Sequence, residues 1–115
     1  MRICREFYFD ASHYLPDYKG KCENLHGHTY KLEVVIEGEI KDDGLVMDFH
    51  RIKKIVESEV IEKLDHKNLN DIIDNPTAER IVEWIYDHLK DKLPLSSLRL
   101  WEGVGKWVEK IIENR

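Results

Sequence analysis

The fold is decided in one stretch, Cys22-Glu23-Asn24-Leu25-His26-Gly27-His28-Thr29-Tyr30-Lys31-Leu32-Glu33-Val34-Val35-Ile36-Glu37. From His26 onward apolar and polar residues alternate, which is the period of a strand with one buried face. His26 and His28 continue the apolar face, and Gly27 between them allows close approach of another backbone. Two imidazoles on one face form half of a metal site. Cys22 lies in a predicted loop just before them and is a candidate nucleophile, base or ligand.

Composition limits the classes of protein that this chain can belong to. With 115 residues, 42% hydrophobic and 36% charged, we expect one globular domain over residues 1–115. The apolar runs are shorter than the roughly 20 residues of a membrane span, so we expect no membrane partner. A net charge of -5 argues against nucleic-acid binding. The N-terminus does not resemble a signal peptide, which predicts a cytoplasmic protein with reduced cysteines.

A first strand precedes this stretch. Residues 3–13 alternate, with Ile3, Phe7, Phe9 and His13 on the apolar parity. From this pattern alone, His13 is either a histidine of the core or a third metal ligand. A loop with Pro16 and Gly20 then returns the chain toward His26 and His28.

Two amphipathic helices follow, and then two further strands. Asp48 is a candidate N-cap for a helix of about four turns that ends near Leu64, and a second helix opens at Asn75-Pro76-Thr77. Residues 98–101 and 106–112 are predicted as a final strand pair around Gly103 and Gly105, with a helix as the alternative for the last segment. We therefore predict an α+β fold: a four-stranded antiparallel sheet in ββααββ order with both helices on one side.

Two further places carry candidate chemistry. Asp65 directly precedes His66 in a segment too polar for the core, where a helix C-terminus with a histidine is the structural interpretation. Glu102 is an acid among apolar neighbours at the bend of the last strand pair. A four-stranded sheet also leaves two open edges, which pairing between subunits would close.

Taken in order, these segments resemble the 6-pyruvoyl-tetrahydropterin synthase and 6-carboxy-tetrahydropterin synthase family. The resemblance spans nearly the whole chain. Its blocks are Phe9-Asp10-Ala11-Ser12-His13-Tyr14-Leu15-Pro16, Cys22 to His28, Met47-Asp48-Phe49, Leu64-Asp65-His66, Asn75-Pro76-Thr77-Ala78-Glu79 and Glu102. It implies the tunnelling fold (T-fold), a homo-hexamer built as a dimer of trimers, active sites between subunits, and a small-molecule pterin substrate.

The resemblance also implies roles for individual residues. His13, His26 and His28 match the zinc ligands, and Cys22 matches the catalytic cysteine. Asp65 and His66 match its partner pair, supplied by a neighbouring subunit, and Glu102 matches the acid that anchors the pterin. Thr77 and Glu79 match a pterin-binding segment. Ala78 and the sequence Gly103-Val104-Gly105 depart from the threonines common in the family.

The implied activity is that of a zinc-dependent lyase acting on 7,8-dihydroneopterin triphosphate to give 6-pyruvoyl- or 6-carboxy-tetrahydropterin. Three imidazoles with an open fourth position suit a catalytic Zn²⁺ site. Three alternatives stay open at this point. They are a dihydroneopterin-cleaving variant that uses Glu23 as base, a zinc hydrolase that uses Glu23, and a non-catalytic zinc- or pterin-binding protein with Cys22 as fourth ligand.

Overall fold

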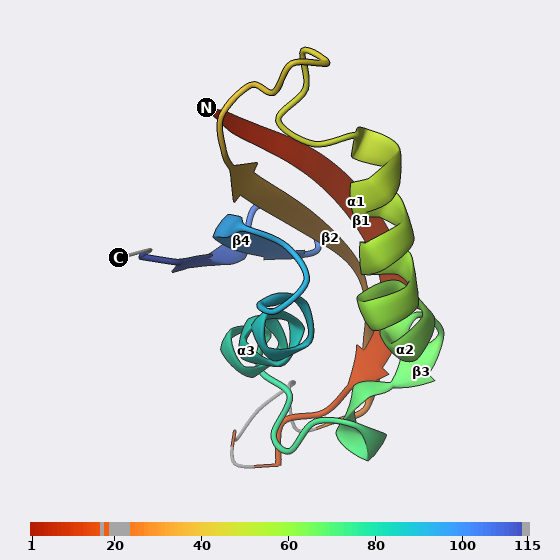
Figure 1. Cartoon of the computed structure of the whole chain (residues 1–115). Coiled ribbons are helices and arrows are strands. Elements are labelled where there is room, and N and C mark those ends of the chain that lie inside the picture. The colour runs from red at the N-terminus through yellow and green to blue at the C-terminus, as the bar shows by residue number, and fades with distance from the viewer. Residues whose placement is uncertain (17, 19–23, 114–115) are drawn as a thin grey trace.

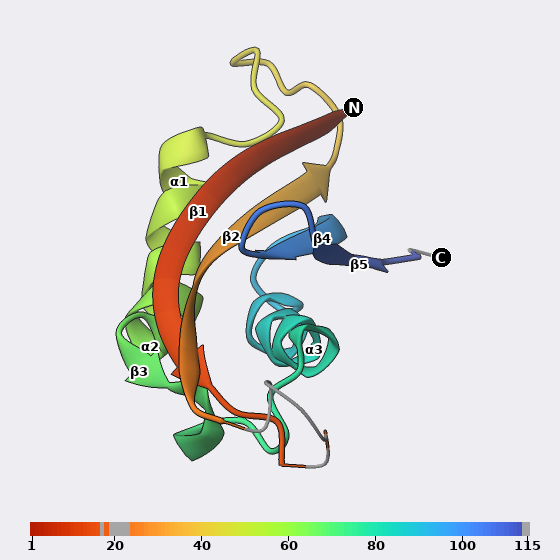
Figure 2. The ribbon, with the colours of Figure 1, turned by 180° about the vertical axis from the view of Figure 1, so that it is seen from behind.

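The protein is built on a long antiparallel hairpin. The structure is a computed structural model that describes residues 1–16, 18 and 24–113. Strand β1 (Arg2–His13) pairs with β2 (His26–Glu37) over its full length, from Arg2 opposite Glu37 to His13 opposite His26. This register brings the end of β1 beside the start of β2, as Figure 1 and, from behind, Figure 2 show.

The sheet has five strands in the order β3-β1-β2-β4-β5. Strand β4 (Leu95–Glu102) pairs antiparallel with β2, and β5 (Trp107–Ile111) pairs antiparallel with β4. The predicted count of four strands was one too low. The fifth, β3 (Lys67–Asn68), lies parallel to β1 at Ala11 and Ser12, and a two-residue strand is too short to show alternation in a sequence.

The first predicted helix is continuous from residue 49 to residue 64 but changes its winding. It begins as α1 (Phe49–Val56), widens to a π-helical turn over Glu57–Ile61 and ends as α2 (Glu62–Leu64). Its fully buried residues recur every four positions: Ile52, Val56, Val60 and Leu64. Four residues of an α-helix overshoot a full turn by about 40°, so the wider turn keeps this stripe on one face.

Helix α3 (Ala78–Leu89) lies on the same face of the sheet as α1. Arg5 Nη1 donates to the backbone oxygen of Phe49 at the start of α1, and His13 Nδ1 lies 2.8 Å from the backbone oxygen of Pro76, just before α3. Arg5 and His13 have the same parity on β1, so both helices cover one face. The predicted α+β architecture is confirmed.

The core lies between this face and the helices. It contains Phe7, Phe9 and Ala11 from β1, Tyr30, Leu32, Val34 and Ile36 from β2, and the apolar stripes of α1 and α3. The opposite face of the hairpin is polar and largely exposed. In the part of the chain that the structure describes, no helix has the length and apolar character needed to cross a membrane.

Candidate metal centre

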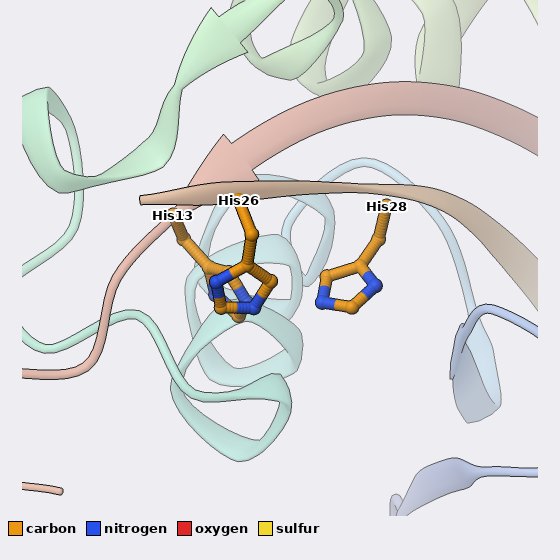
Figure 3. Close-up of side chains that lie close together, drawn as sticks. All are labelled: His13, His26 and His28. Atoms are coloured by element: carbon orange, nitrogen blue, oxygen red, sulfur yellow. The ribbon is translucent and has the colours of Figure 1, made fainter. Parts of the chain in front are cut away.

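Three histidines converge where β1 ends and β2 begins (Figure 3). The candidate ligand nitrogens of His13, His26 and His28 all lie within 4.8 Å of one another. Their ring centroids are 4.7 to 5.1 Å apart. The strand register explains this grouping, since His13 and His26 are paired across the ladder and His28 follows on the same face.

Backbone carbonyls orient two of the imidazoles. His13 Nδ1 lies 2.8 Å from the oxygen of Pro76, and His26 Nδ1 lies 2.6 Å from the oxygen of Asn24. A carbonyl oxygen can only accept, so each Nδ1 carries the proton and donates it. The lone pair of each Nε2 is then free. This backbone bond on the far nitrogen is the usual support of a metal-bound histidine.

Two imidazole nitrogens of the cluster are buried without partners. Among the described residues, His13 Nε2 and His28 Nε2 are buried and have no hydrogen-bond partner. Leaving a buried polar atom unpaired costs about 1–3 kcal/mol, which a bound metal ion would offset. The imidazole set suits Zn²⁺, and no fourth described histidine, cysteine or carboxylate joins this group. Such a site can keep a position for substrate.

Glu102 lies at the end of β4, beside this cluster. Its Oε1 is 3.4 Å from His28 Nε2, although the two atoms do not have hydrogen-bond geometry. Burial lowers the pKa of His28, Glu102 opposes that shift, and His13 and His26 add to it. Because the net direction is downward, the His28 imidazole is kept neutral, as metal binding requires.

Asp65 and His66 form a pair at the opposite face of the hairpin. His66 Nδ1 lies 3.0 Å from Asp65 Oδ2, and the His66 side chain is 78% exposed. The backbone N–H of Asp10 donates to Asp65 Oδ1 and lowers the Asp65 pKa; burial opposes this shift, and the contact with His66 adds to it. Within one chain the pair belongs to a group of its own with Asp10, separate from the three histidines. Cys22 and Glu23 lie outside the described residues.

Comparison with known proteins decides the family. The family model described as 6-pyruvoyl tetrahydropterin synthase matches residues 2–111. The chain belongs to this family. It is therefore a lyase of the tetrahydropterin synthase kind, as the resemblance in the sequence implied.

Two relatives and one solved structure show the range of the 6-pyruvoyl tetrahydropterin synthase family around this chain. A dihydroneopterin monophosphate aldolase of Pyrococcus furiosus is 50% identical over 106 residues, covering 89% of this chain and 90% of that protein. A 6-carboxy-5,6,7,8-tetrahydropterin synthase of Haemophilus influenzae is 36% identical, with coverages of 94% and 96%. The structure of 6-pyruvoyl tetrahydropterin synthase from Caenorhabditis elegans superposes with a TM-score of 0.88 at 24% identity, covering 98% and 96%.

Two residues that the family resemblance assigned to the pterin pocket have other visible roles. Thr77 is the N-cap of α3, and its hydroxyl accepts from the backbone N–H of Arg80. Glu79, in the first turn of α3, lines a hollow of about 550 Å³ with Trp84 and Asp87. None of the three histidines lines that hollow. The structure of one chain therefore does not bring Glu79 to the metal centre.

Sequence reasoning missed two residues that contact this candidate metal centre. Tyr30 is fully buried with its ring edge against His13 and His28, and its hydroxyl lies 3.4 Å from His13 Nδ1. Burial and then Glu102 raise its pKa. Pro76 contributes the backbone oxygen that orients His13, and a pattern of side chains cannot predict a backbone contact. Tyr30 shares the parity of His28, and that was the one signal available in the sequence.

Proposed function

We propose that this enzyme is a Zn²⁺-dependent lyase that acts on the side chain of a phosphorylated 7,8-dihydroneopterin. The observation that supports this proposal most is the buried, unpartnered Nε2 atoms of His13 and His28, beside His26 and within reach of Glu102. A zinc hydrolase or a structural zinc protein would not need an acid at the position of Glu102. In a pterin lyase, Glu102 would orient the pterin ring of the substrate.

His13, His26 and His28 are the proposed ligands. Bound Zn²⁺ would supply Lewis-acid polarisation of the substrate's side-chain hydroxyl groups, which acidifies the protons that the reaction removes. Glu102 accepts hydrogen bonds from the amino and N–H groups of the pterin ring and so fixes the side chain toward the histidines. Lys106 lies beside the same carboxylate, with its Nζ 3.9 Å from Glu102 Oε1.

The proton transfers fall to the chain's own acids and bases. Cys22 or Glu23 is the proposed base, and the Asp65–His66 pair is its partner, with Asp65 holding the Nδ1 proton of His66. Because the pair lies on the opposite face from the histidines, we propose that a neighbouring subunit supplies it. Thr77 and Glu79 remain proposed contacts of the pterin pocket.

Two reactions share this machinery. Elimination of triphosphate from 7,8-dihydroneopterin triphosphate leads to the 6-pyruvoyl or 6-carboxy product, as the family resemblance implied. In the alternative, the hydroxyl on the second side-chain carbon loses its proton and the bond between the first and second carbons breaks. A phosphorylated aldehyde leaves, the ring imine takes up the electron pair, and the first carbon is then protonated.

The relatives favour the second reaction. The Pyrococcus furiosus aldolase aligns at 50% identity over 106 positions. The alignment with the Haemophilus influenzae synthase runs over 136 positions, more than the 115 residues of this chain, so it contains insertions. We therefore propose carbon–carbon cleavage of dihydroneopterin monophosphate as the main reaction, with the triphosphate lyase as the second candidate.

The assembly is part of the proposal. Strand β3 covers β1 at just two positions, and β5 ends the sheet on the other side with Trp107 and Ile111 exposed. Open strand edges of this kind favour pairing between chains. A single domain over residues 1–115, a homo-hexamer of two trimers with shared sites, and a cytoplasmic location all stay predictions.

The test is product analysis. The purified enzyme is incubated with dihydroneopterin monophosphate or triphosphate, before and after chelation and after Zn²⁺ is returned, and products are identified by mass spectrometry. We expect a phosphorylated aldehyde and a hydroxymethyl pterin from the monophosphate, lost on chelation and restored by Zn²⁺. Release of triphosphate with a pyruvoyl or carboxy pterin would establish the second candidate. Absence of turnover with either substrate would contradict both.

The base is identified by two variants, Cys22→Ala and Glu23→Gln. Removing a positioned base lowers kcat by about 10²- to 10⁴-fold with little change in KM. Carbon–carbon cleavage with Glu23 as base predicts this loss in Glu23→Gln and near-normal activity in Cys22→Ala. The reverse result would assign proton transfer to Cys22.

A further inference from the structure

Asp10 faces away from the three histidines, on the exposed face of the hairpin, and the proposed reaction gives it no role. It lies on β1 opposite Thr29 of β2, and both residues line a hollow of about 530 Å³ together with His66. The carboxylates of Asp10 and Asp65 and the His66 imidazole all lie within 4.8 Å of one another. His66 therefore faces two acids.

The backbone of Asp10 holds both members of the Asp65–His66 pair. Its N–H donates to Asp65 Oδ1 over 2.9 Å, and its carbonyl oxygen accepts from the N–H of His66 over 2.6 Å. His66 has a φ of +58°, a left-handed conformation that a non-glycine residue adopts at a cost. The two bonds to Asp10 hold the chain in this conformation and so set the point from which the imidazole projects.

The side chain of Asp10 is fixed in turn by Thr29, whose hydroxyl donates to Asp10 Oδ1 over 2.5 Å. The backbone of Thr29 accepts from the N–H of Gly103, the residue after Glu102. The Asp10 carboxylate thus keeps a set place beside His66, although it is exposed. A fixed carboxylate beside an imidazole stabilises the imidazolium that forms when the ring takes up a proton.

We infer that Asp10 is a positioning residue for His66: its backbone fixes the turn that carries the Asp65–His66 pair, and its carboxylate, held by Thr29, is the second acid that stabilises the protonated imidazole. This inference rests on the proposed function, in which His66 takes part in proton transfer. It adds Asp10 and Thr29 to the residues that set the rate.

The first test is kinetic and uses Asp10→Asn, which keeps the backbone bonds and the size of the side chain. We expect kcat to fall about 10-fold with KM and bound metal unchanged, since a helper of an acid–base group accounts for part of that group's effect. The matched control is Glu6→Gln, which removes a carboxylate from the same face of β1, where Glu6 contacts Lys31. We expect the control to keep wild-type activity.

A double variant separates positioning from a general structural effect. In the His66→Ala background, Asp10→Asn should lower the residual kcat no further, because groups that act as one unit are not additive. Thr29→Val should reproduce part of the loss, and Thr29→Ser, which keeps the hydroxyl, should restore it. Wild-type kcat in Asp10→Asn, or an equal loss with and without His66, would overturn the inference.

A spectroscopic measurement tests the role of Asp10 independently of the proposed function. In protein labelled with ¹⁵N-histidine, the ring-nitrogen signals of His66, assigned by their absence in His66→Ala, should shift in Asp10→Asn and stay in place in Glu6→Gln. Failure of the wild-type enzyme to turn over any pterin would refute the function and leave this prediction standing. Unchanged His66 signals in Asp10→Asn would overturn the positioning role, whatever the activity.

Discussion

At the scale of one residue, His13 shows how the end of a strand can present a candidate metal ligand. Its side chain is 1% exposed, its Nδ1 proton is bound to Pro76, and its Nε2 has no partner among the described residues. A histidine of the core would use both nitrogens. One nitrogen tied to the backbone and the other left free is an arrangement that stabilises a bound ligand more than it stabilises the empty fold.

Asp65 gives a prediction for the pH dependence of stability. Its pKa is lowered in the folded state, first by the backbone N–H of Asp10. A lowered pKa contributes stability above the unfolded value of about 4, and this contribution is lost as the pH falls through the folded value. Asp65→Asn should therefore lower the free energy of unfolding at pH 7, by at most about 1 kcal/mol at this partly exposed site.

Denaturant unfolding of both proteins from pH 7 to pH 3 measures this effect. The difference between wild type and Asp65→Asn should shrink steadily below about pH 4. A difference that stays constant over the whole range would mean that the ionised carboxylate of Asp65 contributes nothing to the fold.

At the scale of elements, α3 connects stability with the metal centre. Its N-cap Thr77 directly follows Pro76, whose carbonyl orients His13. Thr77→Ala should cost about 1 kcal/mol of stability and should also weaken metal binding, because the start of α3 becomes less fixed. Asp48→Ala is the matched control, since Asp48 caps α1 through the N–H of His50 and is not a member of the histidine cluster.

Titration with Zn²⁺ and thermal unfolding distinguish the two caps. Both variants should lose similar stability, and Thr77→Ala alone should bind metal less tightly, with Thr77→Ser close to wild type. Equal metal affinity in Thr77→Ala and Asp48→Ala would show that α3 does not position His13.

The elements were largely predictable because long strands and helices leave a period in the sequence. Alternation predicted β1, β2 and the shared face of His26 and His28, and the caps at Asp48 and Thr77 were visible as residue types. Strand β3 and the π-helical turn were not predictable. A strand of two residues is too short to show alternation, and the widened turn leaves the spacing of apolar residues in the sequence unchanged. The assignment of His13 as a ligand needed the family resemblance, because His13 is brought beside His26 by strand pairing, which one strand's pattern does not reveal.

At the scale of the whole molecule, one chain holds two separate groups of side chains that we propose as half-sites. The histidine cluster lies on the helix side of the hairpin, and the Asp65–His66 pair groups with Asp10, whose side chain is on the opposite face. We expect a site that uses both groups to combine chains. This is the physical reason for the proposed hexamer, beside the uncovered edge of β1.

Subunit mixing tests this arrangement. His28→Ala and His66→Ala should each be nearly inactive as pure proteins, and dissociating and reassembling them together should restore part of the activity, since some sites then receive both residues intact. Sedimentation should show a hexamer at micromolar concentration. A monomer, or no rescue on mixing, would place the whole site within one chain.

Metal stoichiometry tests most directly whether His13, His26 and His28 together hold the metal ion on which the lyase depends. Elemental analysis of the protein after equilibration with Zn²⁺ and removal of free metal should give one zinc per chain in the wild type and in His50→Ala, whose histidine lies on α1 outside the cluster. The triple variant His13→Ala/His26→Ala/His28→Ala should give none. Undiminished zinc in the triple variant would contradict the account.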